Sequence, residues 1–172
     1  MYEGEYLNGF RNGKGKILDT SYKNKLSFEG EYLNNRIAGF GKDYNRNGEL
    51  IFEGEYLYNY KIKGRQYIKG KLEYEGDFLY DTKYNGKGYD ENGNIIYELF
   101  NGNGKVKEYY DNGRLLFEGK YLNGKRNGKG KEYDCNDYLV FEVEYLNGLK
   151  HGKVKEYYYN KLKFEGEYLN GK

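Results

Sequence analysis

Residues 164–171 have the sequence FEGEYLNG, and close variants of this phrase begin at seven earlier positions: Tyr2, Phe28, Phe52, Tyr74, Tyr97, Phe117 and Phe141. The starts follow one another at intervals of 20 to 26 residues. A regular period of this length is typical of a tandem array in which each unit packs only against its neighbours. The chain, residues 1–172, is therefore predicted to be a single repeat array whose last unit is partial.

The composition favours a folded chain with a thin core. Of the 172 residues, 37% are apolar and 33% are charged, and the mean hydropathy is −1.09, which is too polar for a large closed core. The 24 Tyr and 9 Phe recur in phase with the repeat, which argues against a disordered tail. We therefore expect aromatic rings to take the place of aliphatic core residues.

Charge and cysteine content exclude several classes of protein. The 29 Lys and Arg nearly balance the 27 Asp and Glu, so the net charge of +2 gives no reason to expect a nucleic-acid partner. Cys135 is the only cysteine and cannot form an intramolecular disulfide, and no apolar run follows Met1. We therefore expect a cytoplasmic protein, with peripheral association with a membrane or the cytoskeleton left open.

The stretch LLFEGKYL, residues 115–122, shows the pattern of the first strand in each repeat. Leu115, Phe117, Gly119 and Tyr121 alternate with charged or apolar residues, and a period of two predicts a half-buried strand. A glycine between two aromatics on one face predicts that a ring from a neighbouring repeat lies against the backbone there. Val143 replaces this glycine in one repeat, where we expect a displaced ring or a slightly splayed repeat.

A Gly-x-Gly pair predicts the second strand, at residues 13–15, 39–41, 86–88 and 128–130. The repeats are then linked by Asn47-Gly48, Lys69-Gly70, Asn92-Gly93 and Asp111-Asn112-Gly113. Asn-Gly favours a two-residue hairpin turn with positive φ at both central residues. Together these patterns predict an all-β, solenoid-like array of β-hairpins that forms one elongated, twisted antiparallel sheet.

The phrase Tyr/Phe-Glu-Gly-Glu-Tyr-x-Asn-Gly followed by Gly-x-Gly resembles the MORN repeat family over essentially the whole chain. The chain departs from the family pattern in having Tyr where Trp is common, and the units from Phe52 and Tyr97 are incomplete. The Tyr-rich and Lys-rich style is similar to bacterial and viral relatives that include YwqK-type antitoxins. The resemblance implies a twisted sheet that serves as a scaffold or docking surface.

No residues in the sequence suggest a catalytic, cofactor or metal site. The lone His151 and the lone Cys135 have no recurring partner and together supply too few ligands for zinc. Glu pairs such as Glu29 and Glu31 recur in nearly every repeat, so we expect them to pair with lysines across the hairpins. The Gly-x-Gly pairs lie in strands with no helix behind them, which excludes a phosphate loop.

Two surfaces are candidates for partner binding. If the sheet curls, the second aromatics of the repeats line a trough that fits a peptide or helix: Tyr6, Tyr32, Tyr56, Phe78, Tyr121, Tyr145 and Tyr168. Alternatively, these rings only stack on one another. A row of basic turns offers a second surface, for lipid headgroups or other anions: Arg11, Lys14, Lys125, Arg126, Lys129 and Lys150.

These observations predict a non-enzymatic scaffold for protein–protein interaction. Two alternatives stay open, a peripheral membrane module that binds phosphoinositides and an antitoxin-like protein that neutralises a toxin. Solitary repeat arrays usually have atypical polar caps. The terminal units here are ordinary repeats, which leaves a longer protein, edge-strand self-association or pairing with a partner's strand as alternatives.

Overall fold

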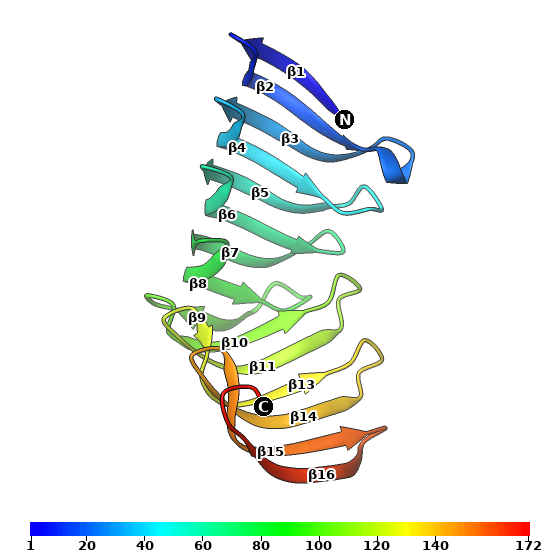
Figure 1. Cartoon of the computed structure of the whole chain (residues 1–172), viewed down its shortest axis with the longest axis vertical. Helices are drawn as coiled ribbons and strands as arrows, with labels where there is room; N and C mark the ends of the chain where they lie inside the picture. The colour runs from blue at the N-terminus through cyan, green and yellow to red at the C-terminus, as the bar shows by residue number, and fades with distance from the viewer. The chain divides into compact units, whose positions relative to one another are not determined.

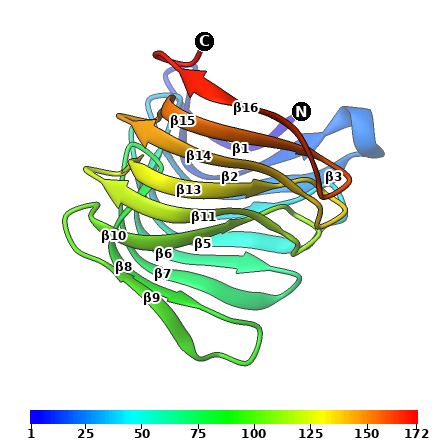
Figure 2. The ribbon, with the colours of Figure 1, turned by 90° about the horizontal axis from the view of Figure 1, so that it is seen from below.

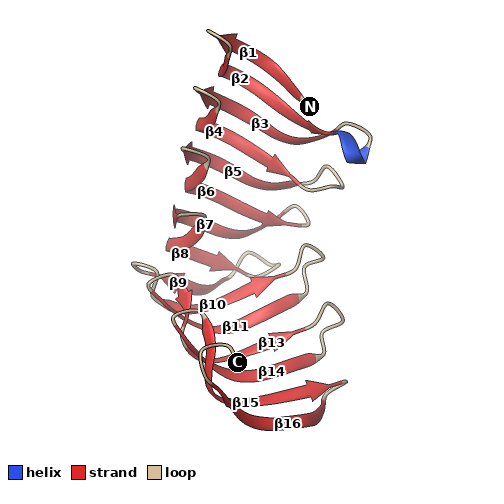
Figure 3. Ribbon diagram, viewed as in Figure 1, coloured by secondary structure: helices blue, strands red, loops and turns tan.

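The computed structural model describes residues 1–172 and consists of antiparallel strands with one short 3₁₀ helix (Figure 3). The all-β class and the hairpin repeat predicted from the sequence are confirmed. The chain divides into two compact units, residues 1–82 with 90–93, and residues 83–89 with 94–172.

In the first unit, each strand pairs with the strand that follows it in the chain (Figure 1). Its elements are β1 (Tyr2–Leu7), β2 (Phe10–Asp19), η1 (Thr20–Tyr22), β3 (Lys25–Leu33), β4 (Arg36–Tyr44), β5 (Leu50–Leu57), β6 (Tyr60–Ile68) and β7 (Lys71–Leu79).

The strands of the second unit are β8 (Thr82–Tyr89), β9 (Ile95–Leu99), β10 (Gly104–Tyr109), β11 (Leu115–Leu122), β12 (Lys125–Arg126), β13 (Gly128–Tyr133), β14 (Leu139–Leu146), β15 (Leu149–Tyr158) and β16 (Lys161–Tyr168). From β10 onward they lie side by side in chain order (Figure 2). The short β12 continues β13 beyond an irregular residue, Asn127, and both pair with β11.

The strands form two sheets, of nine strands (β1 to β9) and seven strands (β10 to β16), so the expectation of one sheet was wrong. The division falls inside the shortened repeat that begins at Tyr97. Strand β9 has only 5 residues, and a single bridge between Phe100 and Asn103 links the arms of its hairpin. Because this repeat is shorter than the others, β9 and β10 have too few paired backbone positions to form a continuous antiparallel ladder.

The sequence predicted two-residue turns at the links between repeats, but most of the two-residue turns lie elsewhere. At Asn47-Gly48 and Asn92-Gly93 only the glycine has positive φ, and these connections are longer loops closed by bonds such as Gly48 N–H to the Asn45 carbonyl. Lys69-Gly70 follows the prediction, with φ of 51° and 73°. The two-residue turns lie mainly at the other end of the hairpins, where both central residues have positive φ: Asn8-Gly9, Asn34-Asn35, Tyr58-Asn59, Tyr80-Asp81, Asn123-Gly124 and Asn147-Gly148.

These two-residue turns are tied to one another across successive repeats. The amide of Asn35 donates to the carbonyl of Arg11, and the side-chain oxygen of Asn35 accepts from the amide of Arg11 at 2.8 Å. Asn59 makes the same two bonds with Ile37. The recurring Asn therefore serves both the tight turn, where it tolerates positive φ, and the stacking of one hairpin on the next.

Aromatic rings lie over the glycines, as the sequence predicts, but most of these rings come from the same repeat; at Gly88 the ring is that of Tyr97 in the following repeat. Gly30 pairs with Gly41 across the hairpin, and the ring of Phe28 covers both. A Cβ at Gly41 would lie 2.6 Å from Cζ of Phe28. Residues i and i+2 share a face of a strand, so the ring leans along its own strand onto the flat glycine pair.

Candidate functional site

Each hairpin has two chemically different faces. On β5, Phe52, Gly54 and Tyr56 are buried on one face, which we call the aromatic face. Glu53 and Glu55 lie on the other, the charged face. The alternation arises because successive side chains of a strand point to opposite sides.

Edge-to-face ring contacts run from ring to ring along the aromatic face of the first unit, and a further such pair lies on this face in the second unit. In the first unit, Tyr56 lies between Phe28 and Phe52, with ring centroids 5.6 and 5.4 Å away. In the second unit, the ring of Tyr145 lies 5.5 Å from that of Phe117. Phe141, two residues before Val143, takes part in none of the edge-to-face pairs and is only half-buried, and whether its ring is displaced or its repeat is splayed stays a prediction. Such pairs contribute roughly 0.5–1.5 kcal/mol each beyond burial.

This packing decides how accessible the predicted ring surface is. Tyr32, Tyr56, Phe78 and Tyr145 are only 4–5% exposed, so their faces are not available to a partner while the hairpins are stacked. Tyr121 and Tyr168 are half-buried, and Tyr6 is 60% exposed. A contact role for these last three rings stays a prediction.

The hydroxyls of the second aromatics are held by carboxylates. Tyr56 donates to Asp43 at 2.7 Å, Tyr121 donates to Glu108 at 2.9 Å, and Tyr145 donates to Glu132. Burial, followed by the neighbouring carboxylate, raises the pKa of Tyr56 above its ordinary value. The phenol of Tyr56 therefore stays protonated, and all three hydroxyls serve as structural donors.

Two of the predicted anion-binding residues are used inside the fold. The guanidinium of Arg126 lies 4.1 Å from the ring centroid of Phe117 and pairs with Glu108 at 2.6 Å and Glu132 at 2.8 Å. Lys150 pairs with the same Glu132 at 2.8 Å. Burial alone would lower the pKa of Arg126, but the hydrogen bond to Glu108 raises it. Their charge is thus neutralised internally and is not offered to a lipid surface.

The other four predicted basic residues are dispersed. Arg11 stacks on the ring of Tyr2, 4.5 Å from its centroid, and Lys125 is an exposed residue beside a two-residue turn. Lys14 and Lys129 are exposed on the charged face, in different units. Anion binding by these four residues stays a prediction.

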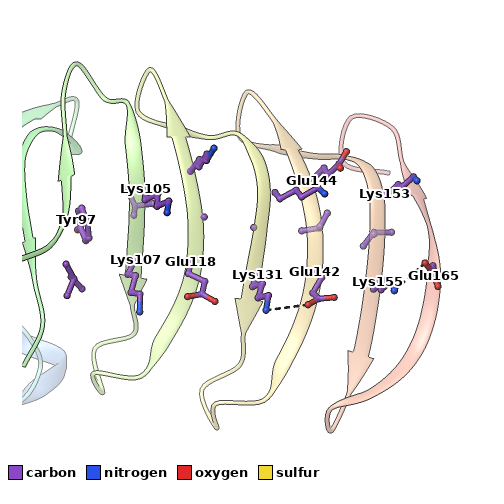
Figure 4. A pocket seen from close by; sticks show the side chains of 18 residues that line it. Tyr97, Lys105, Lys107, Glu118, Lys131, Glu142, Glu144, Lys153, Lys155 and Glu165 are labelled. Carbon is purple, nitrogen blue, oxygen red and sulfur yellow. Dashed lines mark ion pairs between the residues drawn. The ribbon is translucent and has the colours of Figure 1, made fainter.

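The charged face of the second unit contains a cavity of about 630 Å³ that crosses β9 to β16. Two rows of side chains form its walls, and the strand backbones at Gly119, Gly130, Val143 and Val154 lie between them (Figure 4). Lys105, Lys120, Lys129, Glu144 and Lys153 form one row, which we call the lysine wall. Lys107, Glu118, Lys131, Glu142, Lys155 and Glu165 form the other, the paired wall.

The paired wall alternates in sign from one strand to the next. Cross-strand register places Lys131 opposite both Glu118 and Glu142, and its Nζ lies 3.5 Å from Glu142. Lys155 likewise lies 3.6 Å from Glu165. Tyr133 and Tyr157 donate to Glu118 and Glu142, at 2.9 and 2.8 Å. This wall confirms the cross-strand Glu–Lys pairs predicted from the sequence.

The lysine wall lacks this balance. Lys105 stands directly opposite Lys120, and all four lysines of the wall are exposed and make no ion pair. Of these four, the sequence had pointed only to Lys129. The available signal was Lys120, because the same position is acidic in six other repeats: Glu5, Glu31, Glu55, Asp77, Glu144 and Glu167.

The first unit has a smaller cavity on its charged face, of about 500 Å³, between β1 and β4. Its basic residues Lys14, Lys16 and Lys42 stand opposite glutamates, and Lys16 pairs with Glu29 at 3.5 Å. No two lysines face each other there as Lys105 and Lys120 do. The excess of positive charge is thus particular to the second unit.

Cys135 and His151 do not form a pair. Cys135 is exposed in the loop between β13 and β14, and His151 lies on β15 next to the turn at the far end of β14. The intervening strand separates them by roughly 20 Å. No group of three or more His, Cys, Asp or Glu side chains is arranged to hold a metal ion.

Repeated hairpins with rings seated on paired glycines define a tandem-repeat β protein. The model of the MORN repeat matches residues 2–22, 28–42 and 117–137. These three segments therefore carry the MORN repeat, and MORN repeats are a non-catalytic family that generally serves as a scaffold for protein or membrane interaction. No curated protein matches the sequence. The chain has no helix that could span a bilayer.

Proposed function

We propose that this chain is a non-enzymatic scaffold that binds a protein partner in the cavity on the charged face of its second unit. The observation that carries this proposal is the cavity of about 630 Å³ between two rows of side chains. Binding sites are usually concave, and this hollow has a size that suits a segment of polypeptide. Arg126 and Lys150, by contrast, are neutralised on the aromatic face, which removes the strongest support for a membrane-binding edge.

The proposal is tested by affinity capture on the immobilised chain, followed by titration of each purified candidate partner. A true partner should saturate at a fixed stoichiometry. It should also protect lysines of the cavity, such as Lys105 and Lys129, from acetylation while Lys16 in the first unit stays reactive.

The competing membrane function is tested by flotation with vesicles that contain phosphatidylserine or phosphatidylinositol 4,5-bisphosphate. The scaffold proposal fails if the chain floats with these vesicles at physiological salt and no protein partner saturates. It also fails if a saturating protein leaves the cavity lysines fully reactive.

A further inference from the structure

One pair of the lysine wall, Lys105 and Lys120, contradicts the electrostatic rule that the rest of the sheet follows, whereas Lys129 and Lys153 stand opposite Glu144 and Glu167. Like charges placed directly opposite each other on neighbouring strands destabilise a sheet. Lys105 and Lys120 occupy such a pair of positions, whereas Lys131 and Lys155 each face glutamates. A position that breaks a local rule without a compensating contact is a candidate for function.

The local structure around Lys120 also differs from that of other repeats. In three of them the acidic side chain at this position folds over a glycine of the next strand: Glu5 over Gly13, Glu31 over Gly39 and Glu144 over Gly152. Gly128 is the corresponding glycine beside Lys120, and no atom lies within 4 Å of where its Cβ would be. The side chain of Lys120 therefore does not cover Gly128, and its ammonium group makes no ion pair.

The opposite wall cannot neutralise these lysines. Lys131 and Lys155 already pair with Glu142 and Glu165, and Glu118 stands between Lys107 and Lys131 on the neighbouring strands. Seven lysines and four glutamates line the cavity, and the surplus positive charge lies on the lysine wall. A ligand with negative charge on one side would complete the pattern of alternating charge.

We propose, resting on the proposed function above, that the cavity takes an acidic segment of the partner protein, whose carboxylates pair with Lys105, Lys120 and Lys129. Neighbouring strands are about 4.8 Å apart, so a segment that crosses from β10 to β15 spans roughly 19 Å, or about six extended residues. Its uncharged side lies on the glycine and valine backbone of the floor.

A protein segment fits this cavity better than an anionic membrane does. A flat anionic surface would approach the paired wall and the lysine wall together, and so would meet Glu118, Glu142 and Glu165 as well as the lysines. A narrow segment can lie against one wall only. Charge complementarity with a single wall therefore favours a polypeptide with acidic residues on one side.

The decisive variant is Lys120→Glu, because it restores the residue type found in the other repeats. The probe is a fluorescein-labelled decapeptide of alternating Glu and Ala, titrated by anisotropy in 50 mM and 150 mM salt. We expect Lys120→Glu to weaken binding at least fivefold while the melting temperature stays the same or rises. The intact fold separates loss of binding from loss of structure.

The matched control is Lys125→Glu, which changes the net charge equally at an exposed turn outside the cavity. It should change the dissociation constant less than twofold. Equal weakening by the two variants would show that only net charge matters and would overturn the proposal. Binding of an alternating Lys-Ala decapeptide with the same affinity would overturn it as well.

Two further arms separate this inference from the proposed function. If a captured partner protein binds wild type and Lys120→Glu equally, the scaffold function stands and the acidic-segment inference fails. If phosphatidylserine vesicles bind, lose binding with Lys120→Glu, and the Glu-Ala peptide does not bind, the lysine wall recognises lipid and both proposals fail. Binding of the partner lost with Lys120→Glu and kept with Lys125→Glu supports both.

Discussion

The hydroxyl of Tyr56 donates a 2.7 Å hydrogen bond to the carboxylate of Asp43, which stands directly opposite Phe52 on the neighbouring strand. Glu108, Glu132 and Glu156 occupy the equivalent position in the second unit and accept from Tyr121, Tyr145 and Tyr168. The exception is Tyr32. Ile17 stands opposite Phe28, and the buried Tyr32 hydroxyl has no hydrogen-bond partner.

The difference between Tyr56 and Tyr32 predicts that the same Tyr→Phe substitution has opposite effects on the free energy of unfolding at the two positions. Tyr56→Phe should lower the free energy of unfolding by about 1–2 kcal/mol, because it removes a buried charge-assisted hydrogen bond. Tyr32→Phe should be neutral or stabilising, because it removes a hydroxyl whose burial is uncompensated. Urea unfolding followed by far-ultraviolet circular dichroism measures both. Equal destabilisation would show that Tyr32 has an unseen partner.

Ile17→Glu should supply the missing acceptor. The introduced carboxylate would accept from Tyr32 and lie near Arg11, which already acts electrostatically on Tyr32. We expect a gain of about 1 kcal/mol that disappears in the Tyr32→Phe background. The double-mutant cycle checks this; a gain that persists without the hydroxyl would assign the effect to Arg11 alone.

Arg126→Met should be strongly destabilising, because it leaves Glu108 without its guanidinium partner and uncovers Phe117. Breaking such a partly buried pair costs at least about 2 kcal/mol. Lys125→Met, at the exposed neighbouring residue, serves as the control and should change stability by less than about 0.5 kcal/mol. Similar effects at the two positions would contradict the structural role of Arg126.

Gly30→Ala should destabilise the first unit, since its Cβ would lie 2.7 Å from both Gly41 Cα and Phe28 Cζ. Overpacking of this kind costs about 1–3 kcal/mol. Gly9→Asn is the matched control, because Gly9 has φ of 80° with open space around it and Asn35 occupies the same turn position. Thermal melts should separate the two variants; coincident melts would remove the argument that the glycines seat rings.

Alkaline pH should unfold the protein through its buried phenols. Burial raises the pKa of Tyr32 to about 12, and burial followed by a hydrogen bond to a glutamate raises the pKa of Tyr44 and Tyr133 to about 12. A raised folded pKa contributes stability that is fully present below the unfolded value of 10.0 and is lost as the pH rises toward 12.

The measurement is a pH titration of phenolate absorbance alongside circular dichroism. Loss of structure should begin above pH 10 and coincide with ionisation of the buried tyrosines. Complete ionisation of all 24 Tyr with the sheet intact would contradict the burial of these hydroxyls.

Sequence patterns predicted the strands of the hairpin well and its turns less accurately. Period-two alternation predicted the strands around Phe117, and Gly-x-Gly predicted their partners, because both patterns are local. Asn47-Gly48 was expected in a two-residue turn, yet Tyr58-Asn59 forms one and Asn47-Gly48 does not. The register of the flanking strands sets the loop length, and it overrides the preference of the dipeptide.

The candidate site was less predictable than the fold. The second aromatics were expected to line an accessible trough, but their burial depends on rings of adjacent repeats, as the position of Tyr56 between Phe28 and Phe52 shows. Likewise, Arg126 looked like a free cation in the sequence, and only the neighbouring hairpin brings Glu108 to it.

The sequence by itself determined the repeat, the two faces of each strand and the resemblance to the MORN repeat, because these depend on spacing along one chain. Tertiary structure alone decided which charges are neutralised, since an ion pair depends on cross-strand register. Lys131 and Lys120 are similar residues in adjacent strands, yet register places glutamates opposite the first and Lys105 opposite the second. That difference in partner makes one lysine part of the sheet and leaves the other available for a ligand.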